Sequence, residues 1–249
     1  MKKSILLLTL GLTLILGACG EDTETVVVLT SSGYEPYEMV DTSGNLTGFD
    51  IELMEALAAE IGIEIEWKDV DFDGIIASLQ SENAEIAIAG ISPSAERALV
   101  VDFSNVYYNS ESGLTNYMLF NDANSIATLS DLDGLIVGAQ LGTVQASLLE
   151  ELSTMYNFTV DLRTTNTQII EEINAGRIDV LVVENIVATS IIEANSGLDK
   201  VILDYSTDSL NGNAIAFTQG SEYVELFNEA LVTITDNGVL AELITKWFE

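Results

Sequence analysis

An arginine ends the stretch ISPSAER, residues 91–97, in a chain that holds 40 aspartates and glutamates but only 8 lysines and arginines. The guanidinium of Arg97 offers a planar set of N–H donors that grips a carboxylate through two charge-assisted hydrogen bonds. In so acidic a chain the same group could instead form a surface salt bridge with a neighbouring acid. The residue type alone leaves both interpretations, an anion-binding site and a surface ion pair, open.

The residue types that the chain lacks exclude several catalytic centres. The 249 residues include no histidine and one cysteine, Cys19. Ser-His-Asp and Cys-His catalysis, and zinc or iron sites with histidine ligands, are therefore excluded. Catalysis by a carboxylate, a lysine or a tyrosine stays open, whereas an internal disulfide is impossible.

The segment DVDFDG, Asp69 to Gly74, has the first half of an EF-hand calcium loop. A complete loop requires a bidentate glutamate at its twelfth position, where this chain has Gln80. The same residues fit a turn from a strand into a helix, with Asp73 as the N-cap. We favour the turn, and we expect neither a metal site nor a cofactor in this chain.

The chain begins with the features of a secretory signal peptide. Lys2 and Lys3 precede an apolar run from Ile5 to Leu16, which is short for a membrane span. The next residues complete the sequence L-G-A-C, which resembles the lipobox of bacterial lipoproteins, where the cysteine is acylated and becomes the mature N-terminus.

We expect residues 1–18 to be the signal peptide and residues 19–25 to be a lipidated tether. Several acyl chains on Cys19, palmitate among them, would hold the protein on the outer face of the cytoplasmic membrane, at the cell surface or in the periplasm. The alternative is an ordinary secretory signal that ends near Ala18 and leaves a free thiol.

The formal net charge of -32 disfavours nucleic acids and anionic membrane surfaces as partners, because both would be repelled. The acids are spread along the chain, which indicates a solvated acidic surface. We expect no nucleic acid partner.

From Val26 onward, short apolar runs alternate with amphipathic segments. We expect helices at 49–62, 72–84, 143–155, 167–176 and 185–195, and two more at the C-terminal end. We expect strands at 26–30, 63–67, 85–90, 135–140, 158–162, 178–184, 201–205 and 214–218. Repeated β-α-β units of this kind predict an α/β protein with mostly parallel sheets covered by helices.

Two polar segments, 109–113 and 206–213, interrupt this pattern and enclose one complete run of β-α units. We therefore expect two lobes joined by two crossover strands. Lobe 1 would comprise residues 26–110 and 213–249, and the inserted lobe 2 residues 111–212. A cleft between lobes is a common place for a small-molecule site.

Arg97 has a definite place in this arrangement. The expected strand at 85–90 runs into a loop in which Ser92, Pro93 and Ser94 begin a helical turn. Arg97 follows just beyond the carboxyl end of a parallel strand, where open α/β sheets bind ligands.

The stretch FDGIIASLQSENAEIAIAGISPSAERALVVDFSNVYY closely resembles the signature of the extracytoplasmic polar amino acid-binding proteins of ABC importers, solute-binding protein family 3. The segments GYEPYEMVDTSGNLTGFDIELMEALA, LSDLDGLIVGAQLGTVQ and INAGRIDVLVVEN resemble further family segments in the same order. The likeness runs from about Val26 to the C-terminus. It implies the two-lobed periplasmic-binding-protein type II fold, also called the Venus flytrap, with two hinge crossovers.

The resemblance also implies roles for individual residues. Arg97 matches the arginine that clamps the α-carboxylate of the ligand, helped by the backbone N–H of Ser92. Thr143 and Val144 match positions at a helix start whose N–H groups reach the same carboxylate. The physics agrees, because helix N-termini hold unpaired donors and a partial positive charge.

The α-ammonium of the ligand should be received by the Gly90 carbonyl, the Ser92 hydroxyl and an acid that aligns with Glu184. The family usually has aspartate at this last position, so the extra methylene changes the geometry. Glu184 would take the ammonium or lean toward the ligand side chain. The alternative is that it caps the next helix.

Tyr34 and Phe72 match the aromatic walls that enclose the ligand side chain, although without the resemblance both would be ordinary core residues. Ser31 stands where members that prefer basic amino acids often carry an acid. Its identity argues against a lysine or arginine preference, whereas Glu184 and the acidic surface argue for one. The sequence therefore leaves a polar and a basic ligand open.

The resemblance implies a substrate-binding lipoprotein, not an enzyme, that captures a free amino acid and delivers it to the permease of an ABC-type importer. We expect a monomer. One alternative is an amino acid sensor or receptor subunit. Another is a dehydratase of the same fold with Glu184 as its acid.

Overall fold

The computed structural model describes residues 25–109, 115–205 and 212–249. The expected signal peptide 1–18, Cys19 and the first lobe boundary after residue 110 lie outside the described residues. Within them, two five-stranded mixed sheets and one short hairpin form the framework.

The first sheet has the strand order β4 (Glu64–Asp69), β1 (Thr25–Thr30), β5 (Ile86–Ala87), β12 (Ala216–Thr218) and β6 (Val101–Phe103). The second has the order β11 (Leu198–Ile202), β7 (Asn116–Asn121), β10 (Val180–Glu184), β8 (Ile136–Gln140) and β9 (Thr159–Arg163). The hairpin pairs β2 (Met39–Val40) with β3 (Leu46–Thr47). We use lobe 1 for the described residues 25–109 and 212–249, and lobe 2 for residues 115–205.

Each sheet has one strand that runs against the others. In lobe 1, β1 is parallel to β4 and β5, whereas β12 is antiparallel to both of its neighbours. In lobe 2, β8 is parallel to β9 and β10, whereas β7 is antiparallel to both of its neighbours. The reversed strands are the first to follow each passage of the chain between lobes. Four of the five strands in each sheet thus point the same way, but four of the eight strand pairings are antiparallel, so the expectation of mostly parallel sheets holds for strand direction and not for pairing.

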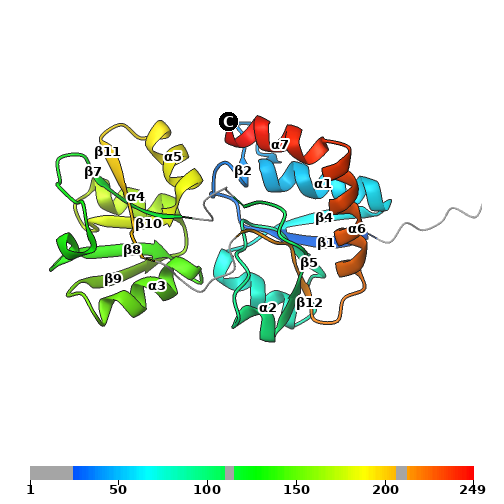
Figure 1. Ribbon diagram of the computed structural model, residues 1–249, viewed down its shortest axis with the longest axis horizontal. Coiled ribbons are helices and arrows are strands. Elements are labelled where there is room, and N and C mark those ends of the chain that lie inside the picture. Colours follow the sequence, from blue (N-terminus) through cyan, green and yellow to red (C-terminus); the bar gives the residue numbers. More distant parts are fainter. Residues whose placement is uncertain (1–24, 110–114, 206–211) are drawn as a thin grey trace, which may run out of the picture.

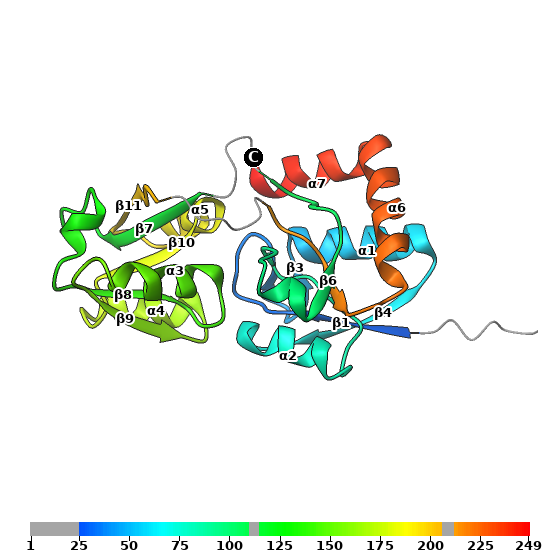
Figure 2. The same ribbon diagram turned by 60° about the horizontal axis from the view of Figure 1, so that its bottom comes forward.

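Helices cover the faces of both sheets (Figure 1). In lobe 1, α1 (Phe49–Ile61), α6 (Tyr223–Asp236) and α7 (Val239–Phe248) lie on one side and α2 (Ile75–Gln80) lies on the other, as Figure 2 also shows. In lobe 2, α3 (Val144–Ser153) contacts β8 and β9, α4 (Asn166–Asn174) contacts β8 and β10, and α5 (Asn185–Ala194) contacts β7 and β10.

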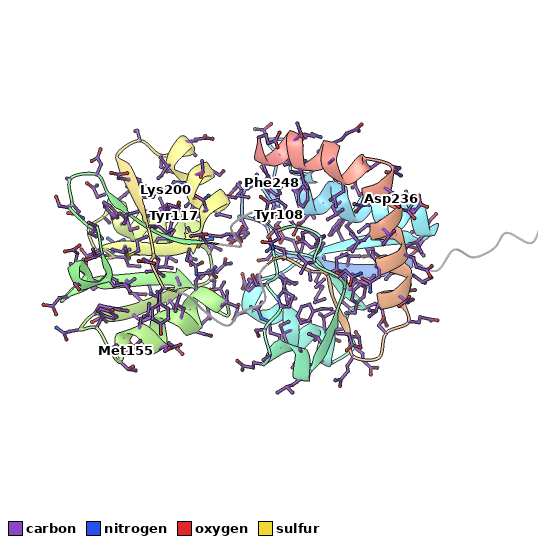
Figure 3. The ribbon with its side chains drawn as sticks, in the orientation of Figure 1. Tyr108, Tyr117, Met155, Lys200, Asp236 and Phe248 are labelled. Atoms are coloured by element: carbon purple, nitrogen blue, oxygen red, sulfur yellow. The ribbon has the colours of Figure 1, made fainter. Side chains whose placement is uncertain are left out.

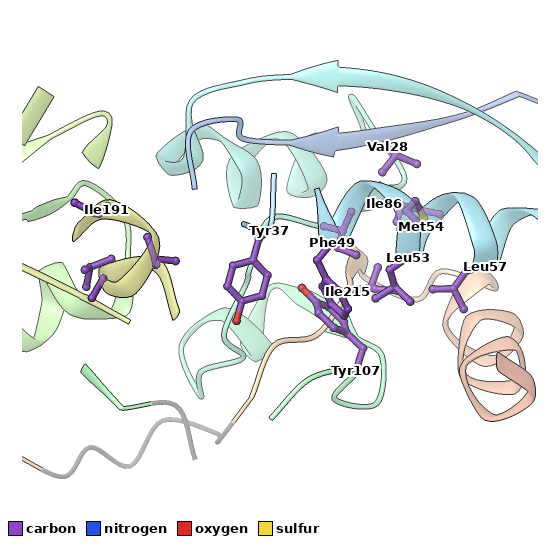
Figure 4. Packing of buried hydrophobic residues seen from close by; sticks show 14 of the residues in the cluster. Val28, Tyr37, Phe49, Leu53, Met54, Leu57, Ile86, Tyr107, Ile191 and Ile215 are labelled. Carbon is purple, nitrogen blue, oxygen red and sulfur yellow. The ribbon is translucent and has the colours of Figure 1, made fainter. Parts of the chain in front are cut away.

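The apolar spacing of α1 produces the packing that the sequence predicts. Leu53, Met54 and Leu57 are buried against Val28 and Ile86 of the sheet (Figure 4). Burying side chains of this size typically contributes about 1.5–3 kcal/mol each. The core therefore fixes the start of α1 against the carboxyl end of the sheet, where the cavity described below lies.

Several local expectations were wrong. The strand expected at 201–205 is Leu198–Ile202, because its pairing with β7 sets its limits. Strands β2, β3, β6 and β7 were not expected. Asp73 is not the N-cap of α2: it lies in a 3₁₀ turn, Phe72–Gly74, and Gly74 takes the N-cap position.

The calcium-like segment is part of this framework. Asp69, the last residue of β4, accepts hydrogen bonds from the N–H and the hydroxyl of Ser32 at 2.9 and 2.5 Å. Gln80 ends α2. Among the described residues, no group of three or more potential metal-ligating side chains was found.

The two crossings between lobes lie side by side. The N–H of Tyr107 donates to the Asn213 carbonyl, and the N–H of Asn213 donates to the Tyr108 carbonyl, both at 2.9 Å. Tyr108 also packs against Phe248 of α7, with ring centroids 4.5 Å apart, at the junction of the lobes (Figure 3).

Gly48 allows a close approach that positions the start of α1. The N–H groups of Phe49 and Asp50 donate to the carbonyls of Pro36 and Tyr37 at 3.0 and 2.9 Å. Gly48 has a φ of +132°, and a Cβ there would lie 2.2 Å from the Tyr37 carbonyl oxygen. Only glycine lets the two segments meet in this way.

Gly48→Ala should therefore lower the free energy of unfolding by about 2 kcal/mol or more, since backbone strain alone costs on the order of 1–3 kcal/mol. Gly44→Ala is the matched control, because Gly44 also has a positive φ, of +87°, but no atom lies within 4 Å of the added Cβ. Urea unfolding of both variants measures the difference. Equal losses would show that the contact with Tyr37 is unimportant.

Candidate functional site

A cavity lies between the lobes. From lobe 1 it is lined by Ser31, Tyr34, Glu38, Phe72, Ala89, Gly90, Ser92 and Arg97. From lobe 2 it is lined by Gln140, Thr143, Val144 and Gln145.

The lobes are closed around this cavity. Arg97 Nη2 of lobe 1 donates a hydrogen bond to the Gly142 carbonyl of lobe 2 at 2.9 Å. A Cβ on Gly142 would lie 2.8 Å from Asp73 Cα across the same junction. Contacts as close as these require the lobes to be together, so the structure is the closed conformation.

The Arg97 guanidinium is fixed but retains free donors. Nη1 donates to the Ser92 carbonyl at 2.7 Å, and the group lies 5.5 Å from the centroid of the Phe72 ring. Burial lowers the pKa of Arg97 to about 10, so the guanidinium stays charged at neutral pH. An arginine carries five N–H donors, and the two carbonyls take two of them. The remaining N–H donors are suited to hydrogen bonds with an anion in the cavity.

Lobe 2 presents the start of α3 to the same cavity. The Thr143 hydroxyl accepts the N–H of Ala146 at 3.1 Å and donates to the Gln140 carbonyl at 2.7 Å. The N–H groups of a first helical turn have no partner within the helix. Val144 and Gln145 line the cavity, so the positive end of the helix dipole lies at its wall. Such a helix start suits an anionic group.

Tyr34 forms an aromatic wall that depends on glycine at position 90. Its ring stacks on Tyr37, with centroids 5.6 Å apart and an interplanar angle of 21°. Gly90 has a φ of +55°, and a Cβ there would lie 2.9 Å from the Tyr34 ring. A larger residue would strain the backbone and displace this wall.

Two carboxyl groups lie at the wall near Tyr34. Glu38 and Asp50 are both fully buried. Asp50 Oδ2 accepts the N–H of Gly90 at 2.6 Å and the hydroxyl of Tyr107 at 2.9 Å. Among the described residues, both Glu38 oxygens and Asp50 Oδ1 accept no hydrogen bond from any third group. The two carboxyl groups lie close enough to share a proton in a hydrogen bond with each other.

Burial is the main cause that raises the pKa of both groups. It raises the pKa of Glu38 well above its ordinary value, and the charge of neighbouring Asp50 adds to the effect. Burial raises the pKa of Asp50 to about 7, although the hydrogen bonds from Gly90 and Tyr107 oppose it. Because two buried negative charges would repel each other, such a pair is stabilised when a proton or a cation binds to its carboxyl oxygens.

Glu184 lies outside the cavity lining. It is 2% exposed, and its Oε1 accepts the hydroxyl of Tyr37 at 2.7 Å. Tyr37 belongs to lobe 1 and Glu184 ends β10 of lobe 2, so this hydrogen bond joins the lobes. In Figure 4, Tyr37 lies between Phe49 of α1 and Ile191 of α5. Burial raises the pKa of Glu184 to about 7, and the bond from Tyr37 opposes it. Glu184 occupies the N-cap position of α5, but its side chain makes no capping bond.

The structure thus brings together seven of the eight residues that the sequence singled out for the ligand, and Ser31 beside them: Tyr34, Phe72, Gly90, Ser92, Arg97, Thr143 and Val144. Glu184 contacts Tyr37 instead. Sequence reasoning missed Glu38, Gln140 and Gln145. Acids are so abundant in this chain that nothing marked Glu38 as buried.

Comparison with known proteins identifies the family. Residues 26–249 match the profile of the bacterial extracellular solute-binding proteins, family 3. The chain belongs to this family. The chain is 37% identical to the arginine-binding extracellular protein ArtP of Bacillus subtilis, over all of this chain and 98% of that protein. Solute binding is therefore the function of the protein.

Solved structures of relatives agree with this family 3 assignment. An ancestral arginine-binding protein bound to arginine superposes with a TM-score of 0.83, at 32% identity, over 90% of this chain and 98% of that one. An ancestral amino acid-binding protein described as a precursor of cyclohexadienyl dehydratase gives a TM-score of 0.78, at 28% identity, over 90% and 95%. The type II periplasmic-binding-protein fold is confirmed.

The family places this solute-binding protein at the cell surface or in the periplasm. Among the residues that the structure describes, no helix combines the length and the apolar character that a membrane span requires.

Arg97→Ala should weaken binding of L-arginine, used as a probe, at least tenfold, because loss of one partner of a buried charged contact costs about 2–5 kcal/mol. Calorimetric titration measures the dissociation constant. The control is Arg163→Ala, which removes a lobe 2 arginine paired with Asp161 outside the cavity lining. Unchanged affinity in Arg97→Ala would contradict the assignment of Arg97 as the anion clamp.

Proposed function

We propose that this family 3 protein captures an amino acid with a cationic side chain, L-arginine above all, and delivers it to the permease of an ABC-type importer. The observation that carries the proposal is the pair of unmatched groups in one closed cavity. Arg97 is a partly buried cation, and Glu38 is a buried acid whose two oxygens have no hydrogen-bond partner other than Asp50 among the described residues.

These two groups do not neutralise each other. The ion pairs of the described residues are Arg163 with Asp161, Arg177 with Glu172, and Lys246 with Glu52. The neighbouring side chains that act on the pKa of Glu38 are Asp50, Glu35 and Asp69, all of them acids. A ligand with an anionic group and a separate cationic group satisfies both sites at once.

In the proposed complex, the α-carboxylate lies on Arg97 and on the N–H groups of Ser92 and Val144. The N–H of Thr143, which the sequence also offered, donates to the Gln140 carbonyl at 3.3 Å. The α-ammonium donates to the Ser92 hydroxyl and the Gly90 carbonyl. That carbonyl already accepts Asn213 Nδ2 at 2.7 Å, but a carbonyl oxygen has a second lone pair. Contact of the ammonium with Glu184 would require that carboxylate to release the Tyr37 hydroxyl.

The side chain of the ligand then passes between Tyr34 and Phe72 and ends at Glu38. This carboxyl supplies the acid that Ser31 does not, which removes the sequence argument against a basic ligand. The relatives support the same choice, since ArtP is named for arginine and the ancestral protein was solved with arginine bound.

The proposal has three further parts. Cys19 is acylated, which anchors the protein to the outer face of the cytoplasmic membrane. The protein acts as a monomer that docks in its closed form on the permease. It binds its ligand without catalysing a reaction, and a hinge motion of the two lobes opens and closes the site.

Thermal unfolding tests the choice of ligand, because binding to the native state raises the unfolding midpoint by mass action. L-Arginine should raise it most. L-Citrulline, which has nearly the same shape but no side-chain charge, should raise it much less. Agmatine, which lacks the carboxylate, should have no effect.

Glu38→Gln provides the matched comparison, since it keeps the shape of the side chain and removes its charge. In this variant, L-arginine should raise the unfolding midpoint much less than in the unmodified protein, whereas L-citrulline should raise it by the same amount. Equal shifts with both ligands in the unmodified protein would refute the basic preference. No shift with any amino acid would refute amino acid binding itself.

A further inference from the structure

Three buried acids lie close together beside the cavity. Glu38 and Asp50 are fully buried and Glu184 is 2% exposed. Glu38 and Asp50 act on each other directly, and the charge of Glu184 acts on Asp50 as well. Two neighbouring carboxyl groups without solvent or a cation cannot both ionise, so such a pair retains a proton.

The surroundings of the pair favour that proton. The hydroxyl groups of Tyr34, Tyr37 and Tyr107 border the acids, and their own pKa values are raised, mainly by burial, so they stay neutral. The remaining charged neighbours of Glu38, Glu35 and Asp69, are acids. Arg97 lines the same cavity, but no ion pair joins it to Glu38 in the described part of the chain.

The carboxyl oxygens of Glu38 and Asp50 indicate where a ligand cation could replace a proton. Asp50 Oδ2 is held by Gly90 and Tyr107. Among the described residues, Asp50 Oδ1 and both oxygens of Glu38 have no third partner, so the only hydrogen bond open to them is the one that a proton forms between the two carboxyl groups. Glu38 also lines the cavity. A cation that enters the cavity therefore meets an acid whose proton it can replace.

We propose that capture of a cationic amino acid expels a proton from the Glu38–Asp50 pair, so that binding is coupled to proton release. The inference rests on the proposed function. The carboxylic O–H bond breaks, the proton passes to the solvent buffer, and the resulting carboxylate pairs with the side-chain cation of the ligand. Asp50 acts as a positioning residue that shares the proton with Glu38. A neutral side chain leaves the proton in place.

The sign of the pH dependence follows from this exchange. At low pH the proton competes with the ligand cation, so affinity for L-arginine falls as the pH decreases from 8 to 5. The fall approaches about tenfold per pH unit for each proton released. The pKa of about 7 for Asp50, and the raised pKa of Glu38, set this window. Affinity for L-citrulline stays nearly constant.

Calorimetric titration of the full protein at pH 6.5, in buffers with different ionisation enthalpies, counts the protons directly. L-Arginine itself keeps its protonation state at this pH, because its guanidinium titrates far above it. We expect release of roughly half a proton to one proton with L-arginine and none with L-citrulline, in line with a pKa near 7.

Two variants locate the proton. Glu38→Gln should abolish its release, and Asp50→Asn, whose amide oxygen can still accept from Gly90 and Tyr107, should reduce it. Glu55→Gln, an exposed acid on the same helix as Asp50, is the matched control and should release as many protons as the unmodified protein. If Asp50→Asn does not fold, comparison of proton release between Glu38→Gln and the unmodified protein still tests whether the proton comes from the Glu38–Asp50 pair.

The outcomes are distinguishable. L-Arginine binding without net proton exchange would overturn the coupling and leave the proposed function standing. Proton release that persists in Glu38→Gln would also overturn it, because the proton would then come from another group. Failure of every amino acid to bind would overturn both proposals.

Discussion

The cavity is governed by charges that the protein leaves uncompensated. The Arg97 guanidinium is held by two backbone carbonyls, Ser92 on its own lobe and Gly142 on the other. No ion pair of the described residues joins it to a carboxylate. Glu38 is buried with no hydrogen-bond partner other than Asp50 among the described residues. Groups in such surroundings are costly unless a ligand or a proton satisfies them. The free energy that drives closure can therefore come from the ligand, since its charges supply the missing partners.

The fold keeps these charges apart and rigid. Asp50 is the residue through which several segments meet: its N–H donates to Tyr37, and its carboxylate accepts from Gly90 and Tyr107. Asn213, where the chain returns to lobe 1, binds the Gly90 carbonyl and lies beside the Tyr37 hydroxyl. The hinge, the start of α1 and the end of β5 are thus joined in one buried hydrogen-bond network. Glu184 adds lobe 2 to it through Tyr37 when the lobes are closed.

Much of this arrangement could be predicted from the sequence, because it depends on local patterns. The helical spacing of residues 49–61 gave α1, and the alternation of apolar runs gave the α/β class. The family resemblance located Arg97, Tyr34 and Phe72 at one cavity. The contacts of Glu184 and Glu38 could not be predicted in this way. Whether an acid is buried depends on tertiary packing, and both positions looked like any other acid in a chain with 40 of them.

The most direct test of the account is a crystal structure of the protein with L-arginine bound. The account predicts closed lobes, with both carboxylate oxygens of the ligand about 2.7–2.9 Å from the Arg97 guanidinium, as in charge-assisted hydrogen bonds. It also predicts the guanidinium of the ligand at a similar distance from Glu38, while Glu184 keeps its bond to Tyr37. A ligand whose side chain points away from Glu38, or whose carboxylate does not touch Arg97, would contradict it.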